Sequence, residues 1–372
     1  MSSAQPLSGV LVVSIEQAVA APTCTVRLAD AGARVVKIER AEGETARHYD
    51  RAVHGTSAYF AWLNRGKQSA VLNLKDTDDL ALTKRMIAKA DVFVQNLAPG
   101  AAVRLGLGPD DLRSLNERLI SLAIVGYGED TPYAKMRAYD LLVQAESGVC
   151  HVTGTPEEAC KVGVSVADIA TGMNAHAAIL EALIERSVTG KGRHIEMAMF
   201  DTLADWMNVP LLHFDYEDRE TQRFGLGHAS VYPYRPYSCV DGEVVIVVQN
   251  PGEWRRLCEM VLEKPDLVDD PRFHDNPARL KNRVALDEEI SDVIRNLHRS
   301  DAINRLEGAD LAWANLSTVG DLSRHPALRR LSCEVEGGAF SLAAPALHPN
   351  LETRRVPELG ADTDRIREEF SE

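Results

Sequence analysis

Short, predominantly apolar runs alternate with amphipathic stretches through the first third of the chain. These runs lie at residues 10–15, 34–39, 70–74, 92–94 and 119–125. Runs of this kind are typical of strands that are buried on both faces of a sheet. Between them, residues 22–32 and 78–90 repeat their apolar positions at the helical period, which predicts helices. This order predicts an α/β fold with a largely parallel, doubly wound sheet.

The second half of the chain has a different pattern. A strand is expected at residues 243–248, and helices are expected after Pro251, at 284–297 and at 301–307. A chain of 372 residues also exceeds the size at which a single hydrophobic core usually stops growing. We therefore expect more than one domain. The predicted division is a large domain at 1–200, a linker at 201–224, a smaller α+β domain at 225–325, and a segment at 326–372 that returns to the large domain.

The composition is that of an ordinary globular protein, with 45% hydrophobic and 26% charged residues. A formal net charge of -14 argues against nucleic acid or an anionic membrane as a partner. The 6 cysteines are scattered without C-x-x-C or zinc-type spacing, so we expect free thiols and no metal site. The first residues show no leader segment, and no apolar run is long enough to span a bilayer. These features favour a cytoplasmic location.

Asp168 is the most informative residue of the stretch from Val162 to Phe200. It follows the apolar residues 164–167 and precedes a run with helical spacing, so it is expected at a strand-to-helix junction. Two interpretations remain open at this point. Aspartate is a preferred helix N-cap, which requires no chemistry, or the junction presents a catalytic carboxylate to a cleft. In either case, a helix N-terminus is expected to lower the pKa of this carboxyl.

The sequence lacks the motifs of several common kinds of site. The turn after the first predicted strand, residues 16–22, has no G-x-G-x-x-G dinucleotide fingerprint, and the chain has no P-loop, G-x-S-x-G or H-E-x-x-H motif. Instead, polar and basic residues follow the predicted strands, where an open parallel sheet binds its ligands. Each of them alone is also consistent with a solvated surface position. Together they suit a phosphate-rich small molecule. They are Arg40, Arg65, Lys67, Asn96, Arg104 and Arg137.

Longer motifs follow one another in a fixed order along nearly the whole chain. They are Leu7-Ser8-Gly9, Lys37-Ile38-Glu39-Arg40, Asn96-Leu97-Ala98-Pro99-Gly100, RAYDLLVQAESG at 137–148, VGVSVADIATGM at 162–173, Thr189-Gly190-Lys191-Gly192, Gly227-His228, Pro233-Tyr234, and Pro357-Glu358-Leu359-Gly360 with Thr363-Asp364. In order and spacing, this set resembles the class III CoA-transferases, the family of formyl-CoA transferases, carnitine CoA-transferases and acyl-CoA racemases.

The resemblance implies a CoA-transferase with a Rossmann-like large domain that holds CoA, and a homodimer of two interlocked subunits. It also implies that Asp168 is the nucleophile. The residues that match CoA contacts in relatives are Ala18, Arg40, Leu72, Leu74, Asn96, Arg104, Arg137 and Tyr139. Substrate contacts are expected at Val19, His228 and Tyr234. The backbone amides of residues 18–20 are expected to stabilise an oxyanion. Coenzyme A is then a substrate, and no cofactor is permanently bound.

A carboxylate nucleophile suits this chemistry, because an aspartyl anhydride and then an enzyme-CoA thioester retain the free energy of the original thioester. The expected reaction moves CoA from an acyl-CoA, such as succinyl-CoA, to a small carboxylic or dicarboxylic acid. Oxalate is disfavoured as acceptor, because the consecutive glycines of formyl-CoA:oxalate transferases have no counterpart near residues 223–228. An acyl-CoA racemase is one alternative, but such relatives carry histidine where Tyr139 stands. A non-catalytic CoA-binding protein is the other.

Overall fold

The computed structural model describes residues 5–371, which form two compact units. The first unit comprises the chain up to Val149, Lys161–Leu211 and the chain from Leu328 onward; the second comprises Cys150–Cys160 and Leu212–Ala327. Residues 1–4, where the sequence shows no leader segment, and residue 372 lie outside the described residues. The predicted domain boundaries near residues 200, 225 and 325 stay a prediction.

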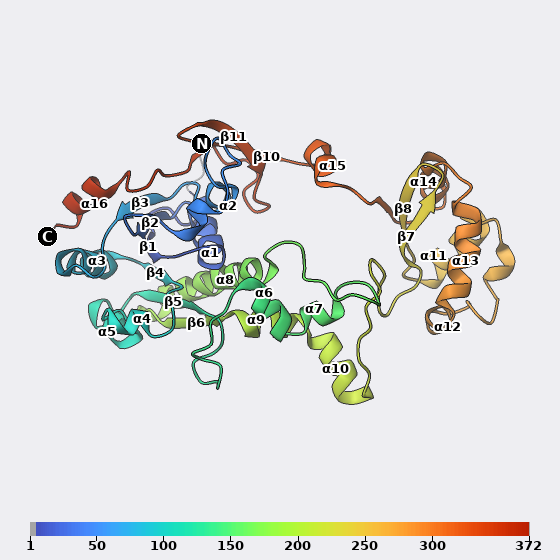
Figure 1. Ribbon diagram of the computed structural model, residues 1–372, viewed down its shortest axis with the longest axis horizontal. Helices are drawn as coiled ribbons and strands as arrows, with labels where there is room; N and C mark the ends of the chain where they lie inside the picture. The colour runs from blue at the N-terminus through green and yellow to red at the C-terminus, as the bar shows by residue number, and fades with distance from the viewer. Residues whose placement is uncertain (1–4, 372) are drawn as a thin grey trace. The chain divides into compact units, whose positions relative to one another are not determined.

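A six-stranded parallel sheet forms the centre of the first unit, in the order β3-β2-β1-β4-β5-β6 (Figure 1). The strands are β1 (Leu11–Ile15), β2 (Arg34–Glu39), β3 (Gln68–Val71), β4 (Val92–Gln95), β5 (Ile120–Val125) and β6 (His194–Ala198). The register places Val13 of β1 between Val36 of β2 and Phe93 of β4. The strand order reverses between β1 and β4, and open parallel sheets bind ligands at the carboxyl ends of their strands beside such a switch point. The predicted α/β fold is confirmed.

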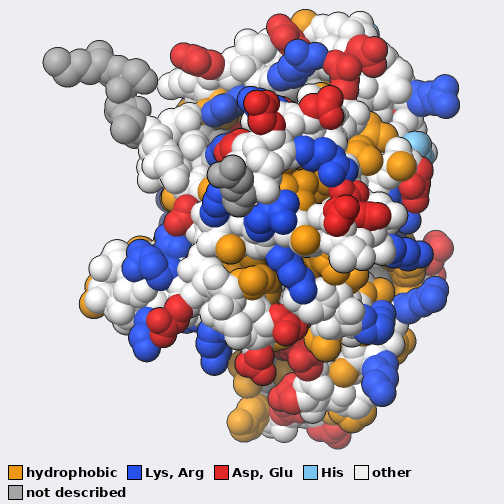
Figure 2. Space-filling view, turned by 90° about the vertical axis from the view of Figure 1, so that its left-hand side faces the viewer, with side chains coloured by type: hydrophobic (Ala, Val, Ile, Leu, Met, Phe, Trp, Pro, Cys, Tyr) orange, Lys and Arg blue, Asp and Glu red, His pale blue; other side chains and the backbone are white. Residues whose placement is uncertain are grey.

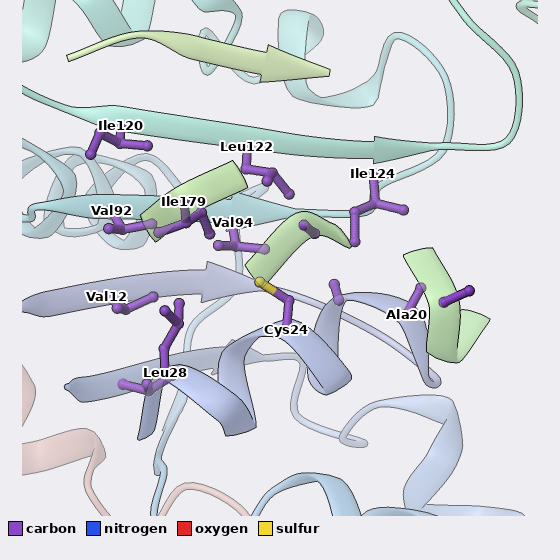
Figure 3. Close-up of a cluster of buried hydrophobic side chains, with 14 of the residues drawn as sticks. Val12, Ala20, Cys24, Leu28, Val92, Val94, Ile120, Leu122, Ile124 and Ile179 are labelled. Carbon is purple, nitrogen blue, oxygen red and sulfur yellow. The ribbon is translucent and has the colours of Figure 1, made fainter. Parts of the chain in front are cut away.

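Helices cover both faces of this sheet. On one face, α1 (Ala20–Asp30) and α8 (Val166–Thr189) form a buried cluster with strand residues such as Val12, Val94 and Leu122 (Figure 3). On the other face, α3 (Thr77–Lys89), α5 (Pro109–Leu115) and α16 (Thr363–Glu369) enclose a second cluster around Val13 and Phe93. The strands are therefore buried on both faces, which explains their continuous apolar runs.

The predicted elements of this unit agree with the structure except at two places. The predicted strand at 70–74 is displaced, because β3 ends at Val71 and both Leu72 and Leu74 follow it. The predicted strand before Asp168 is wrong: residues 161–165 form an irregular connection, and α8 begins at Val166. Val164 is 59% exposed, so its short apolar run occupies no buried position in a sheet.

The C-terminal part of the first unit lies along β3, at the edge of the sheet. The backbone N–H of Ser69 donates to Asp362 Oδ2 at 3.0 Å, and that of Val71 donates to Thr363 Oγ1 at 3.0 Å. These side chains therefore satisfy N–H groups that an edge strand would otherwise leave unpaired. Upstream of α16, a smaller sheet contains β10 (Arg330–Val335), β11 (Gly338–Ala343) and β12 (Arg354–Arg355).

The second unit is built on an antiparallel sheet of β7 (Tyr234–Cys239), β8 (Gly242–Val247) and β9 (Trp313–Asn315). Helices α11 (Pro251–Arg256), α13 (Arg283–Ile294) and α14 (Arg299–Gly308) pack around a core that includes Trp254, Ile290 and Leu306. The strand and helices predicted for this part of the chain are confirmed.

The remaining helices connect these elements. They are α2 (Ala58–Leu63), α4 (Ala101–Arg104), α6 (Asp140–Glu146), α7 (Val149–Val152), α9 (Met199–Trp206), α10 (Asn208–Glu217), α12 (Asn276–Lys281) and α15 (Val319–Arg324). On the face seen in Figure 2, basic and acidic side chains are interspersed with hydrophobic ones. The net charge of -14 is therefore not gathered into a continuous acidic surface on that face.

Candidate active site

A cleft of about 680 Å³ opens at the carboxyl ends of the central strands of the first unit. Its lining comes from the ends of β1 and β2, the segments that follow β3 and β4, and helix α4. The lining residues include Ile15–Gln17, Ile38–Glu44, Leu72–Lys75, Leu97, Ala101, Arg104 and Leu105. Four of the predicted CoA contacts therefore line one cleft: Arg40, Leu72, Leu74 and Arg104.

The exposed basic side chains of this cleft suit a phosphorylated ligand. Arg40 follows β2 directly, and its guanidinium lies 3.4 Å from Glu42 in an exposed ion pair. Arg104 is exposed at the end of α4, and the exposed Lys75 also lines the cleft. Sequence reasoning missed Lys75, although it stands directly after the predicted strand at 70–74, just as Arg40 stands after β2. Cations at strand ends are a usual means of binding phosphate in an open parallel sheet.

The prediction for Arg65 and Lys67 is wrong. Both are buried in ion pairs, Arg65 with Asp30 and Lys67 with Glu16, and neither lines the cleft.

Two side chains from other parts of the unit hold the turn that follows β1. The amide group of Asn96 accepts from Gln17 N–H and donates to Gln17 carbonyl O, both at 2.9 Å. Glu44 Oε2 accepts from Ala18 N–H at 2.7 Å. Ala18 has a φ of 60°, in the left-handed region that costs a residue with a Cβ about 1 kcal/mol or more. The turn is therefore strained and is held by these bonds.

These bonds change the expected source of oxyanion amides. Ala18 N–H already donates to Glu44, so it is occupied in this structure. Helix α1 begins at Ala20, and the first amides of a helix have no partner within it. Among residues 5–371, no acceptor is found for the N–H groups of Val19, Ala20 and Ala21. The free amides thus begin one residue later than the predicted segment 18–20. The side chain of Val19 is buried, which leaves its backbone for any substrate contact.

Asp168 is the third residue of α8, whose N-cap position is Ser165, so Asp168 is not the N-cap that one interpretation expected. One turn further on, Gly172 packs against the first turn of α1: a Cβ there would come within 2.6 Å of Thr23 Cβ and would overlap Ala20 O. Residues four apart lie on the same face of a helix. Asp168 therefore lies on the face of α8 that crosses the start of α1.

The Asp168 carboxyl binds its proton more strongly than an aspartate in water does. Burial, followed by the nearby carboxylate of Asp140, raises the pKa of Asp168 to about 7. The expected lowering by the helix N-terminus is wrong, because these two effects outweigh the helix dipole. Within residues 5–371, no side chain forms a hydrogen bond or an ion pair with the Asp168 carboxylate. The group is thus half-buried and unpaired, as a nucleophile requires.

Asp140 is structurally engaged. Its Oδ1 accepts from Ala167 N–H at 2.9 Å, and its Oδ2 accepts from Gln144 Nε2 at 2.7 Å. The first bond satisfies an amide at the start of α8 and so fixes the helix end that carries Asp168.

The remaining predicted residues are not among those that line the cleft. Arg137 and Tyr139 are exposed just before α6, and the Tyr139 side chain is 67% exposed. His228 and Tyr234 belong to the second unit, where their rings pack at a centroid distance of 5.2 Å. His228 Nδ1 also accepts from Ser230 N–H at 3.0 Å. Roles for these four residues stay predictions.

In the part of the chain that the structure describes, no three His, Cys, Asp or Glu side chains are grouped so that they could hold a metal ion. The cysteines are free thiols. None of the helices within residues 5–371 is both long and apolar enough to cross a bilayer.

Comparison with known proteins identifies the family. The chain belongs to CoA-transferase family III, whose model matches residues 7–363. Human succinyl-CoA:glutarate CoA-transferase is 30% identical over 99% of this chain and 87% of its own length. Acetyl-CoA:oxalate CoA-transferase of Acetobacter aceti is 33% identical over 91% of this chain and 87% of its own length. A crystal structure of a CaiB/BaiF family protein from Brucella suis superimposes with a TM-score of 0.85, at 31% identity, over 99% of this chain and 100% of the other.

These matches confirm the resemblance and the enzyme class that the sequence predicts. The protein is a CoA-transferase. The names of these two relatives each pair a CoA thioester with a carboxylic acid. The interlocked homodimer and the cytoplasmic location stay predictions.

Proposed function

We propose that this enzyme moves CoA from an acyl-CoA, such as succinyl-CoA, to a small carboxylic or dicarboxylic acid, with Asp168 as the nucleophile. One observation carries the proposal: an unpaired, half-buried carboxylate lies on the face of α8 that crosses the start of α1. Helix α1 in turn follows directly on the turn whose residues Glu16 and Gln17 line the cleft. The carboxylate, the free helix amides and the cleft thus belong to one region of the first unit.

The proposed first half-reaction has two steps. The Asp168 carboxylate attacks the carbonyl carbon of the acyl-CoA, the C–S bond breaks, and an acyl-aspartyl anhydride and CoA thiolate form. The thiolate then attacks the aspartyl carbonyl and releases the donor acid as its carboxylate, which leaves an aspartyl-CoA thioester. The acceptor carboxylate then attacks the aspartyl-CoA thioester, which gives CoA thiolate and an anhydride of the acceptor acid with Asp168. The thiolate attacks the acceptor's carbonyl carbon, which gives the new acyl-CoA and free Asp168. No proton is gained or lost over the cycle.

The residues of the cleft and the first turn of α1 have separate roles in this scheme. Arg40, Lys75 and Arg104 would bind the phosphates of CoA, and Leu72 and Leu74 would contact its apolar parts. Each attack on a carbonyl develops negative charge on its oxygen, and the amides at the start of α1 would stabilise that charge. Because both covalent intermediates hydrolyse in water, the site must exclude it.

A trapping experiment tests the nucleophile. Hydroxylamine attacks an aspartyl anhydride or thioester and leaves a hydroxamate on the side chain. We expect the wild-type enzyme to lose activity only when acyl-CoA and hydroxylamine are both present, and peptide mass spectrometry should find the modification on Asp168. The Asp168→Asn variant serves as the control, and it should be inactive and unmodified. If the wild-type enzyme retains Asp168 unmodified under turnover, the covalent mechanism is wrong.

The acceptor is tested separately, with a panel of acids and CoA esters. The names of the two relatives pair succinyl-CoA with glutarate and acetyl-CoA with oxalate, and both acids are dicarboxylates. We expect succinyl-CoA to serve as a donor, and dicarboxylates of three to five carbons to exceed monocarboxylates of equal length in kcat/KM. Mass spectrometry of the CoA esters formed gives the readout. Equal rates with monocarboxylates would contradict the proposed acceptor class.

A further inference from the structure

The strained turn after β1 is connected to a buried group of charged side chains. Glu44 accepts the Ala18 N–H through Oε2, and its other oxygen forms an ion pair with Lys37. Lys37 Nζ also donates to Asn64 Oδ1 at 3.0 Å. The side chains of Lys37 and Glu44 are almost completely buried, so this pair lies away from solvent.

A second ion pair completes this buried network, which consists of Glu16, Lys37, Glu44, Asn64 and Lys67. Lys67 Nζ lies 2.6 Å from Glu16 Oε1 and 3.2 Å from Asn64 Oδ1, so Asn64 joins the two pairs. The network contains two carboxylates and two ammonium groups, which makes it neutral as a whole. Burial lowers the pKa of Lys67 to about 8, which shows that its charge is costly in this place.

The buried network touches the start of α1 as well as the turn. Glu16 Oε2 accepts from Thr25 Oγ1 at 2.6 Å, and Lys67 Nζ donates to the carbonyl of Pro22 at 3.3 Å. The network therefore contacts the first two turns of α1. Glu16 and Glu44 also line the cleft. The network thus connects the wall of the cleft to the helix start.

Stability alone does not explain such a network. Buried ion pairs are often no more stabilising than apolar residues of similar volume, because desolvation of the charges offsets their attraction. What the ions provide here, and apolar residues would not, is an acceptor for the N–H of a residue at φ 60°. We propose that Glu44 is a positioning residue for CoA transfer: by binding Ala18 N–H, it fixes the turn from which the free amides of Val19, Ala20 and Ala21 project.

The inference rests on the proposed function, since the amides act on charge that develops during attack at or by Asp168. It adds a requirement that the proposed function does not contain. Loss of the Glu44 contact should weaken the stabilisation of the transition state and leave the ground-state binding of the CoA ester little changed. The effect should therefore appear in kcat rather than in KM.

Two charge-balanced double variants test this role. Glu44→Leu with Lys37→Met removes one ion pair and the acceptor for Ala18 N–H. Glu44→Gln with Lys37→Met removes the same two charges but keeps a carbonyl oxygen for that N–H. We expect the first variant to lose about tenfold or more in kcat with the KM for the CoA ester within about threefold, and the second to retain most of wild-type kcat. Thermal unfolding shows that each variant is folded.

A matched control comes from another buried carboxylate of the same unit. Asp30 forms a buried ion pair with Arg65 and has no contact with residues 17–19. Asp30→Asn should lower the unfolding temperature without a selective loss of kcat. If Glu44→Leu with Lys37→Met does not fold, Glu44→Asp replaces it, because its shorter side chain keeps the charge but withdraws the oxygen from Ala18.

The outcomes separate this inference from the proposed function. Equal kcat in the two double variants, or wild-type kcat in the variant without the acceptor, overturns the positioning role of Glu44. Neither result depends on the hydroxylamine experiment, which uses the wild-type enzyme. If Asp168 is not trapped, the nucleophile is wrong whatever the Glu44 variants do.

Discussion

At the scale of single residues, the chemistry of Asp168 depends on its protonation. Its pKa is raised to about 7 by burial and by Asp140, and only the ionised form attacks a thioester. A carboxyl with a raised pKa is protonated below that pKa, so activity must fall as the pH falls. We expect kcat/KM for the acyl-CoA to decrease about tenfold for each pH unit below about pH 7, as measured by transfer rates at subsaturating acyl-CoA.

Asp140 offers a variant that moves this profile. Asp140→Asn keeps an oxygen for Ala167 N–H but removes the negative charge that raises the pKa of Asp168. The acidic limb of the kcat/KM profile should therefore shift to lower pH in this variant. A profile that is flat from pH 8 to pH 5 in the wild-type enzyme would show that the attacking group is not a carboxyl with this pKa.

The sequence singled out Asp168 as the candidate nucleophile, but it did not reveal the surroundings of that residue. The helical spacing after residue 168 placed it correctly near a helix start, and the family resemblance assigned its role. The direction of its pKa could not be predicted, because it depends on burial and on Asp140, which lies 28 residues earlier in the chain and reaches α8 only in the folded structure. The buried ion pair of Glu44 with Lys37 could not be predicted for the same reason, since no local sequence pattern reveals such a pair.

At the scale of elements, the crossing of α1 and α8 determines how close Asp168 comes to the free amides. Gly172 permits this crossing, since a Cβ there would overlap Ala20 O and Thr23. We expect Gly172→Ala to force the helices apart, with a loss of about 1–3 kcal/mol in the free energy of unfolding and a fall in kcat. Urea denaturation and steady-state kinetics measure the two effects.

Gly308 provides the control for this prediction. It lies at the end of α14, and a Cβ at that position would have no neighbour within 4 Å. Gly308→Ala should therefore be neutral or slightly stabilising, as expected for alanine in a helix. If both variants have wild-type stability and kcat, the close contact between α1 and α8 does not limit catalysis.

Most elements of the parallel sheet could be predicted because a strand buried on both faces must be apolar throughout. The apolar runs predict both ends of β1, β2, β4 and β5 to within one residue. The same rule failed at residues 164–167, where Val164 is exposed and Val166 and Ala167 already belong to helix α8. A run of four residues carries too little periodicity to distinguish a strand from a helix start.

At the scale of the whole molecule, the sheet topology brings Arg40, Lys75 and Arg104 to one cleft from three separate segments. Arg40 and Arg104 were predicted as ligand-binding residues and Lys75 was not, whereas the cleft itself depends on the strand order β3-β2-β1-β4. We expect Lys75→Ala to raise the KM for the CoA ester about threefold to tenfold with little change in kcat, because a phosphate contact is equal in ground and transition states.

Lys191 is a suitable control for this effect. It is exposed and does not line the cleft, and its one ion pair within residues 5–371 is with Glu117 at 3.3 Å. Lys191→Ala should leave KM unchanged, and the difference between the two lysine variants should shrink as the salt concentration rises. An unchanged KM in Lys75→Ala would remove that residue from the CoA-binding surface.

The contact of β3 with the C-terminal segment has a consequence for synthesis on the ribosome. Val71 receives its partner Thr363 from a position 292 residues later in the chain. At about 5–20 residues per second, the outer edge of β3 stays open for roughly 15–60 s while the rest of the chain is made. An open strand edge is a template for pairing with another chain. The nascent protein therefore exposes this strand edge until α16 emerges.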